Sequence, residues 1–125
     1  MCSQLGVRKV LVVDDEAQNR WIVETSLKDR NDIQVFSADC GEKALELINE
    51  HEFSLVISDF NMPNGNGEWL LSRIKDKSNA RAMIVSGQRI PMCKLREMGA
   101  VGGMPKPHTK QDFLAVVDFL LGEQC

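Results

Sequence analysis

Val10-Leu11-Val12-Val13-Asp14-Asp15 is the stretch that decides the fold, because an unbroken apolar run ends directly in two acidic residues. An apolar run of this kind is typical of a parallel strand that is covered on both faces. Two adjacent carboxylates at the end of a buried strand repel each other and lose hydration. A cation relieves that repulsion, and carboxylate oxygens are ligands that Mg²⁺ prefers. The stretch therefore predicts a buried strand with a metal site at its carboxyl end.

Three later apolar runs also end in a polar side chain. Parallel α/β sheets place their active sites at the carboxyl ends of their strands, so these side chains and the acidic pair are expected to meet. Together they indicate phosphate chemistry at a metal site. The polar residues and the runs they follow are Asp59 after 55–57, Ser86 after 83–85 and Lys106 after 101–104.

The rest of the chain alternates between strand and helix patterns without a long linker. Five βα units of this length predict an α/β fold with a doubly wound parallel sheet, right-handed crossovers and helices on both faces. Strands are expected at 10–13, 33–37 (an edge strand), 55–58, 83–85 and 101–104, and helices at 17–29, 41–49, 68–75, 91–98 and 110–121. The helical residues expected to face inward are Ile22, Val23, Leu27, Ala44, Leu45, Ile48, Phe113, Val116, Val117 and Leu120. The helix at 68–75 is expected to run through Trp69, Leu70 and Ile74, with Trp69 as a packing or partner-facing residue.

Composition narrows the class of protein. At 125 residues, with 43% apolar and 26% charged residues, the chain has the size and composition of one soluble globular domain. A net charge of −3 gives no electrostatic reason to expect direct binding to nucleic acid or to an anionic membrane. No apolar stretch approaches the ~20 residues of a membrane span. Residues 1–9 lack the apolar core of a signal peptide.

Four cysteines are present, and they form neither a CxxC pair nor a metal-binding pattern. This usage favours free thiols in a reducing cytoplasm. The four are Cys2, Cys40, Cys93 and Cys125.

Five sequence elements agree in order and in strand context with one known family. They are Asp14-Asp15, Asp59-Phe60-Asn61-Met62-Pro63, the Gly67 that closes this loop, Ser86-Gly87 and Lys106-Pro107. The chain resembles a receiver domain of bacterial-type two-component response regulators, of the chemotaxis-regulator kind, from Val10 to Leu121. The resemblance implies a flavodoxin-like sheet order of 2-1-3-4-5. It also implies one receiver domain over 1–125, with its core at about 9–122.

In that family, the aspartate matching Asp59 takes a phosphoryl group from a histidine kinase or a phosphotransfer protein. A carboxylate is a competent nucleophile toward phosphorus and forms an acyl phosphate. Mg²⁺ would shield the negative charge of Asp59, so that an anionic phosphoryl donor can approach it. Its expected ligands are Asp15, Asp59, the Asn61 carbonyl, water and a phosphoryl oxygen, with Asp14 bound through water. Lys106 is expected to bind a phosphoryl oxygen or the Asp59 carboxylate, and the Ser86 hydroxyl a further oxygen.

Simpler interpretations exist for each residue taken alone. Asp14 is suited to cap the helix beginning near Ala17, and Asp59 to satisfy backbone groups of its loop. Ser86 alone is a common turn residue, and Lys106 alone a common surface charge. Their joint occurrence at strand ends favours the functional interpretation over four coincidences.

Two features depart from the family. Gly103 stands three positions before Lys106, where receivers usually carry an aromatic residue that reorients on phosphorylation. Pro105 and Pro107 flank Lys106, and the family commonly has a cis bond at the position of Lys106-Pro107. These departures leave the phosphoacceptor set intact and bear on how the signal is passed on.

Three classes of function follow. The first is a phosphorylated signalling receiver that catalyses only its own Mg²⁺-dependent phosphorylation and dephosphorylation. The second is a pseudo-receiver, which would bind partner proteins without being phosphorylated. The third is a flavin protein or an aspartate-dependent phosphatase, which the missing phosphate loop after 10–13 and the adjacency of the two aspartates disfavour. The expected partner is a downstream protein or a fused output domain, and a phosphorylation-linked dimer is a further option.

Overall fold

The computed structural model describes residues 7–77, 80–106 and 109–122 of the chain. Within these ranges five strands alternate with five helices, as predicted. In chain order they are β1 (Arg8–Val13), α1 (Ala17–Leu27), β2 (Ile33–Ala38), α2 (Gly41–Glu50), β3 (Leu55–Asp59), α3 (Gly67–Lys77), β4 (Arg81–Ser86), α4 (Met92–Met98), β5 (Gly102–Pro105) and α5 (Lys110–Gly122).

The strands form one parallel sheet in the order β2-β1-β3-β4-β5, which confirms the predicted flavodoxin-like α/β fold. β1 and β3 lie side by side, with Val13 paired to Ser58. β3 and β4 are in register through Asp59 and Val85. The register therefore brings the carboxyl ends of the strands, and the polar residues that follow them, to one edge of the sheet.

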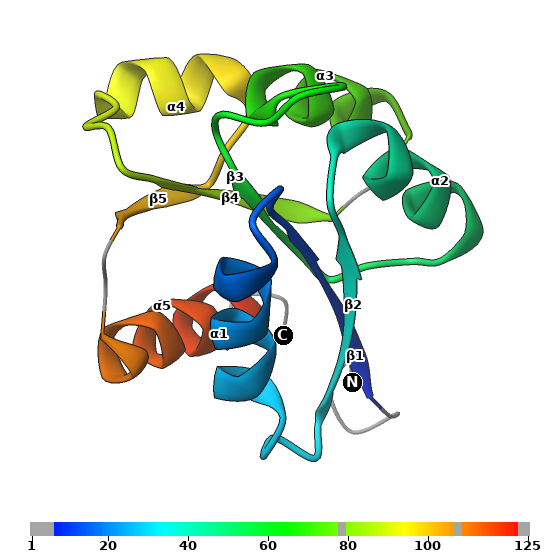
Figure 1. Cartoon of the computed structure of the whole chain (residues 1–125), viewed down its shortest axis with the longest axis vertical. Coiled ribbons are helices and arrows are strands. Elements are labelled where there is room, and N and C mark those ends of the chain that lie inside the picture. Colours follow the sequence, from blue (N-terminus) through cyan, green and yellow to red (C-terminus); the bar gives the residue numbers. More distant parts are fainter. Residues whose placement is uncertain (1–6, 78–79, 107–108, 123–125) are drawn as a thin grey trace.

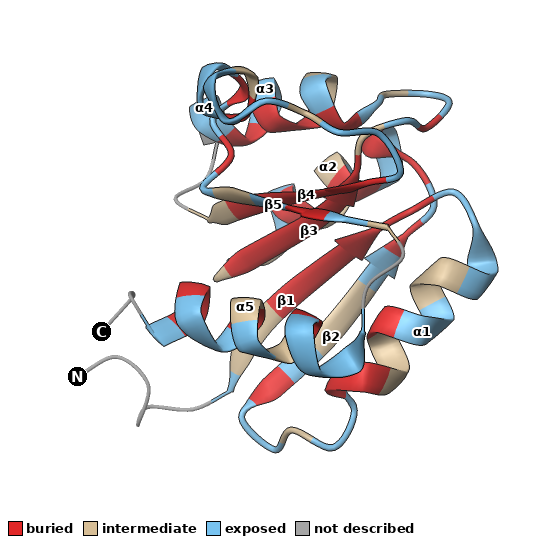
Figure 2. Ribbon diagram, turned by 90° about the vertical axis from the view of Figure 1, so that its left-hand side faces the viewer, coloured by how far each residue is buried: buried red, intermediate tan, exposed pale blue. Residues whose placement is uncertain are grey.

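Helices cover both faces of the sheet: α1 and α5 lie on one face, and α2, α3 and α4 on the other (Figure 1). Each face has its own core. One contains Leu11, Val56 and Ile84 from alternate strand positions, and the other contains Val10, Ile57 and Val85. The central strands are almost wholly buried (Figure 2), which explains why their sequences are apolar throughout.

Some predicted core positions were wrong. Ile22 was expected to face inward but is 41% exposed, because α1 turns Val23, Ser26 and Leu27 toward the sheet. Leu45 and Val116 are half-buried, whereas Leu71 and Leu121, which were not predicted, are buried.

Element boundaries differ by one or two residues from those predicted. α1 ends at Leu27, two residues before the predicted end. Pro91 is the residue before α4 and not part of its first turn, and α4 ends at a left-handed Gly99 with φ of 91°. The predicted cis bond at Lys106-Pro107 lies outside the described residues. None of the helices in the described ranges is long and apolar enough to cross a membrane.

Candidate functional site

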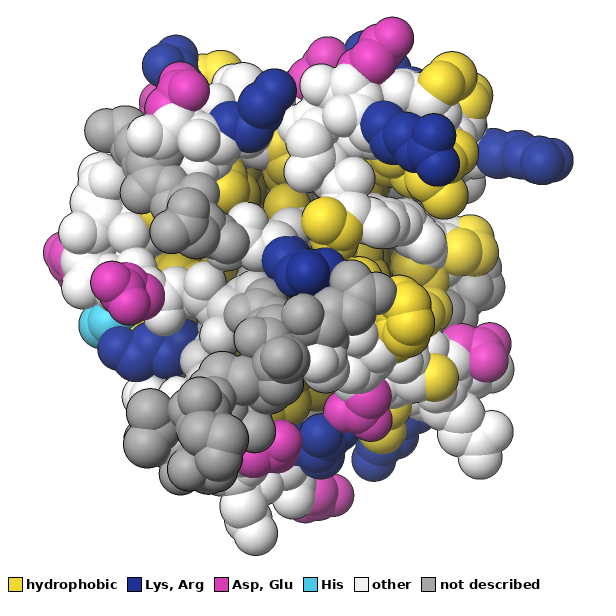
Figure 3. Space-filling view, turned by 180° about the vertical axis from the view of Figure 1, so that it is seen from behind, with side chains coloured by type: hydrophobic (Ala, Val, Ile, Leu, Met, Phe, Trp, Pro, Cys, Tyr) yellow, Lys and Arg dark blue, Asp and Glu magenta, His cyan; other side chains and the backbone are white. Residues whose placement is uncertain are grey.

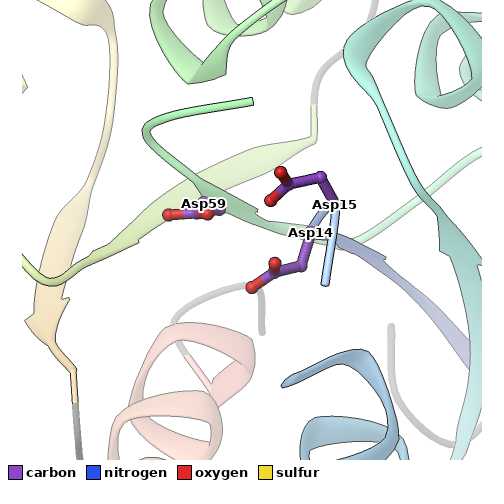
Figure 4. Close-up of side chains that lie close together, drawn as sticks. All are labelled: Asp14, Asp15 and Asp59. Carbon is purple, nitrogen blue, oxygen red and sulfur yellow. The ribbon is translucent and has the colours of Figure 1, made fainter. Parts of the chain in front are cut away.

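Three carboxylates meet at the carboxyl edge of the sheet. Asp14 and Asp15 follow β1, Asp59 ends β3, and one carboxylate oxygen of each lies within 4.8 Å of the others (Figure 4). Asp14 is 6% exposed and Asp59 9%, while Asp15 faces solvent. The donor set is a group of hard oxygens with one open side, which fits a divalent cation such as Mg²⁺ that retains several waters.

Lys106 supplies the positive charge beside these acids. Its Nζ donates to Oδ2 of Asp14 at 2.8 Å and lies 3.4 Å from Oδ2 of Asp59. Burial lowers the pKa of Lys106, but the hydrogen bond and charge of Asp14, followed by those of Asp59, outweigh burial and raise it above its ordinary value. Lys106 is therefore a permanent cation at the site. The shorter contact with Asp14 was not predicted.

The carboxyl group of Asp59 is held in an unfavourable environment for its charge. Burial raises its pKa, and the negative charge of Asp14 raises it further, while Lys106 opposes both effects without cancelling them. The charged form of Asp59 therefore lacks part of the neutralisation that it needs. A divalent cation bound by the three acids would supply the remainder.

Asp14 is fixed by hydrogen bonds of both its side chain and its backbone. Its Oδ1 accepts from the N–H of Glu16 at 2.9 Å, and its carbonyl oxygen accepts from Nη1 of Arg20 at 2.7 Å. Glu16 is the N-cap residue of α1, so Asp14 bonds the chain just before the helix and is not itself the cap that the simpler interpretation expected. Arg20 was missed by sequence reasoning. The available signal was its place on the first helix turn after the acids.

Ser86 and Lys106 are joined through the backbone. Ser86 is 3% exposed, and its carbonyl oxygen accepts from the N–H of Lys106 at 2.8 Å. The Ser86 hydroxyl oxygen accepts from the N–H of Gln88 at 2.9 Å. Because that oxygen already accepts a bond, its O–H group is the part suited to donate to an incoming anion.

The loop after β3 ends at Gly67, a position that has no room for a side chain. The N–H of Gly67 donates to the carbonyl of Phe60 at 2.9 Å, and a Cβ atom on Gly67 would lie 2.6 Å from the carbonyl oxygen of Asp59. Asn61 lies in the same loop and is exposed. Its carbonyl as a metal ligand stays a prediction.

A pocket of about 340 Å³ opens at the site. Asp14, Asp59 and Lys106 are its charged lining residues, and most of the rest are apolar residues of α1 and the sheet. Its lining residues outside the predicted set include Asn19, Ile22 and Val23 of α1. Ile22, which is partly exposed, thus adds an apolar side chain to the wall of this pocket.

The family model for the response regulator receiver domain matches residues 10–118. The chain belongs to this family. The receiver domain is 31% identical over 119 residues to a probable chemotaxis protein CheY of Rhizobium etli, with 91% of this chain and 92% of the relative covered. It is 30% identical to the two-component response regulator ORR7 of Oryza sativa subsp. japonica, over 90% of this chain and 56% of that protein.

Solved structures have the same fold as this receiver domain. A CheY-like receiver domain protein of Methanospirillum hungatei matches 95% of this chain and 97% of its own with a TM-score of 0.88 at 23% identity. The chemotaxis protein CheY4 of Vibrio cholerae matches 92% of this chain and 99% of its own with a TM-score of 0.84 at 26% identity. The predicted family is confirmed.

Gly103 of the receiver domain is covered by α4. A Cβ atom on Gly103 would lie 2.8 Å from Cδ1 of Leu95, so Leu95 fills the space beside β5 in which a larger side chain would begin. Leu95 and Gly103 also line a second pocket of about 470 Å³ that reaches Ser86. Met92 of α4, Val101 just before β5 and Phe119 of α5 are exposed hydrophobic residues. Figure 3 shows hydrophobic side chains at the surface of the molecule seen from behind.

Proposed function

We propose that this receiver domain accepts a phosphoryl group on Asp59 from a phosphohistidine of a histidine kinase or phosphotransfer protein. The main support is the nearly buried carboxylate of Asp59, which lies 3.4 Å from the ammonium group of Lys106. One of its oxygens lies within 4.8 Å of oxygens of Asp14 and Asp15. A carboxylate oxygen attacks phosphorus, an O–P bond forms, and the P–N bond breaks with its electron pair returning to the imidazole. The product is an aspartyl phosphate.

Asp15, Asp59 and the Asn61 carbonyl would hold Mg²⁺ directly, and Asp14 would hold it through water. Mg²⁺ supplies charge neutralisation between the carboxylates and the phosphoryl oxygens. The raised pKa of Asp59 and its cause, burial, support this assignment, because the carboxylate needs more positive charge than Lys106 gives it.

Lys106 and Ser86 would bind the phosphoryl oxygens that the metal leaves free. Lys106 must then move its ammonium group from Asp14 toward the new anion. Ser86 would donate its hydroxyl proton to a second oxygen. Because the N–H of Lys106 donates to the carbonyl of Ser86, the two residues would shift together. Phosphorylation would in this way change the ends of β4 and β5 and the surface next to them.

The downstream partner would be a protein or an output domain that binds the altered surface. The rice regulator ORR7 extends well beyond the matched region, since the match covers 56% of its length. We further propose that residues 1–125 form a single receiver domain with its core at about 9–122. Free thiols at Cys40 and Cys93 are compatible with the reducing cytoplasm expected from the sequence.

A pseudo-receiver is the second candidate function, and Gly103 is the observation that favours it. With Leu95 packed where an aromatic residue would begin, the aromatic relay of the family has no counterpart at this position. Such a protein would use the same surfaces for binding but would not be phosphorylated.

Incubation with acetyl phosphate and Mg²⁺, followed by intact mass measurement, separates the two candidates. A phosphorylated receiver gains one base-labile phosphoryl group, which Asp59→Asn abolishes. The control is Asp39→Asn, because Asp39 is an exposed aspartate that pairs with Lys43 on the surface. Absence of a phosphoryl group in the wild type, or its persistence in Asp59→Asn, would overturn the proposal.

A further inference from the structure

The first turn of α2 is capped by backbone from the β3–α3 loop. The residue before α2 is Cys40, whose side chain makes no capping hydrogen bond. The N–H of Gly41 instead donates to the carbonyl of Gly65 at 3.1 Å, and the N–H of Glu42 donates to the carbonyl of Asn64 at 3.2 Å. The first N–H groups of a helix need such partners, so the loop and the start of α2 depend on each other.

Two glycines allow this close approach. A Cβ atom on Gly41 would overlap the carbonyl oxygen of Gly65. A Cβ atom on Gly65 would lie 3.3 Å from the Cα of Gly41, and Gly65 has a φ of +98°, which L side chains rarely adopt. Asn64 is also left-handed, with a φ of 53°. The backbones can therefore meet in this way only while positions 41 and 65 lack side chains.

Trp69 of α3 covers the glycine pair. Its Cε3 lies 2.7 Å from the Cβ position of Gly65 and 3.0 Å from that of Gly41. The Arg73 guanidinium stacks over the same ring at 5.2 Å from its centroid. The N–H of Trp69 donates to Oδ1 of Asn66, which fixes the start of α3. A large ring therefore holds the tip of the loop against α2.

The loop held in this way runs from Asp59, the proposed phosphoacceptor, to Gly67 at the start of α3. The bond from Gly67 to Phe60 closes the base of the loop next to Asp59, and the bonds to α2 fix its tip. Asn61, the proposed carbonyl ligand, lies between these two fixed points. Any displacement of the loop must therefore change the contacts at Gly41.

We infer that the contact of Gly41, Gly65 and Trp69, here named the α2–loop contact, positions the loop for Mg²⁺ and transmits its displacement to α2. Trp69 is a positioning residue: it acts through the loop backbone and not on the metal. The inference rests on the proposed Mg²⁺ site. Loss of groups that orient metal ligands commonly weakens metal binding by about tenfold or more.

The test is a Mg²⁺ titration followed by amide NMR signals of the whole chain. In the wild type, the Gly41 and Glu42 signals should shift with the same midpoint as that of Asp59. Gly41→Ala and Trp69→Ala should each raise this midpoint about tenfold or more. Trp69→Phe, which keeps a ring, should recover most of the affinity. Gly122→Ala is the control, because a Cβ atom there would meet nothing within 4 Å.

The outcomes separate this inference from the proposed function. An unchanged midpoint in Trp69→Ala, or Gly41 and Glu42 signals that ignore Mg²⁺ while Asp59 responds, would overturn the α2–loop contact as a positioning device. A wild type in which no signal responds to Mg²⁺ would overturn the proposed metal site itself, and the inference with it. If Gly41→Ala does not fold, the comparison of Trp69→Ala with Trp69→Phe decides the question.

Discussion

The ammonium nitrogen of Lys106 lies 2.8 Å from Oδ2 of Asp14, closer than the 3.4 Å that separates it from Oδ2 of Asp59. The lysine therefore serves first as the counter-ion of the acid next to β1, and second as that of the proposed phosphoacceptor. This arrangement assigns Lys106 a structural role before any phosphoryl group arrives.

Removal of Lys106 should destabilise the metal-free protein. Lys106→Ala would leave Asp14 and Asp59 buried beside each other with no cation, at a cost of about 2 to 3 kcal/mol in the free energy of unfolding. Urea unfolding without divalent metal measures this cost. Lys94→Ala is the control, because Lys94 pairs with Glu68 on the surface. A loss in Lys106→Ala no larger than that of the control would contradict the predicted role.

Neutralisation of Asp59 should have the opposite effect. Because burial raises its pKa above the ordinary value of 3.8, the folded state binds a proton more tightly than the unfolded chain does. Ionisation of Asp59 therefore lowers stability as the pH rises from about 4 through the raised pKa. Asp59→Asn should be more stable than the wild type at pH 7 without metal, by about 1 kcal/mol. The difference should vanish below pH 4, which urea unfolding across the pH range would test.

Mg²⁺ should stabilise the folded protein through Asp15. A ligand that binds only the folded state at ten times its Kd adds about 1.4 kcal/mol, or roughly 5 °C in Tm for a domain of this size. Asp15→Ala should remove this shift, and differential scanning fluorimetry would measure it. Glu16→Gln removes a neighbouring negative charge outside the three-acid group and should keep the full shift. Equal Mg²⁺ responses in the two variants would exclude Asp15 as a ligand.

A ring at position 103 should clash with α4. Gly103→Phe must displace Leu95 and should cost about 1 to 3 kcal/mol of stability. Adding Leu95→Ala should restore part of this loss, because the smaller residue leaves room for the ring. Gly102→Ala is the control, since a Cβ atom on Gly102 would meet nothing within 4 Å. Additive losses in the double variant would show that Leu95 does not occupy the space of the ring.

The response to phosphorylation should be graded on the surface of α4, β5 and α5. A ligand shifts a two-state equilibrium only by its differential affinity, and the absent ring removes one source of that difference. Hydrogen exchange with and without beryllofluoride would measure the change in protection. An all-or-none change over the whole surface would contradict this expectation.

The strand ends of the site could be predicted because parallel strands bring their carboxyl ends to one edge of the sheet. The acid that pairs most closely with Lys106 could not be predicted. Asp14 and Asp59 are both acids at that edge, and the choice between them depends on geometry between residues 92 positions apart. The α2–loop contact could not be predicted either. A glycine in the sequence does not show which distant backbone segment it approaches, so the pairing of Gly41 with Gly65 appears only in the structure.

The error at Ile22 has a simple physical cause. Trp21, Ile22 and Val23 are adjacent apolar residues, and a helix cannot turn all three toward the sheet. The buried stripe instead includes Ser26, whose hydroxyl donates to the carbonyl of Ile22 at 2.8 Å. That bond satisfies the hydroxyl within the helix and lets a polar residue take a position that the apolar pattern alone would not assign to it.

The shortness of β5 has a consequence for self-association. This edge strand spans only Gly102–Pro105, and its last residue lacks an N–H group. An exposed strand edge invites pairing with another chain, and short edges that contain proline discourage it. The strand that carries Gly103 in place of an aromatic residue thus also disfavours extension of that side of the sheet by a sixth strand, and the aggregation that such pairing begins.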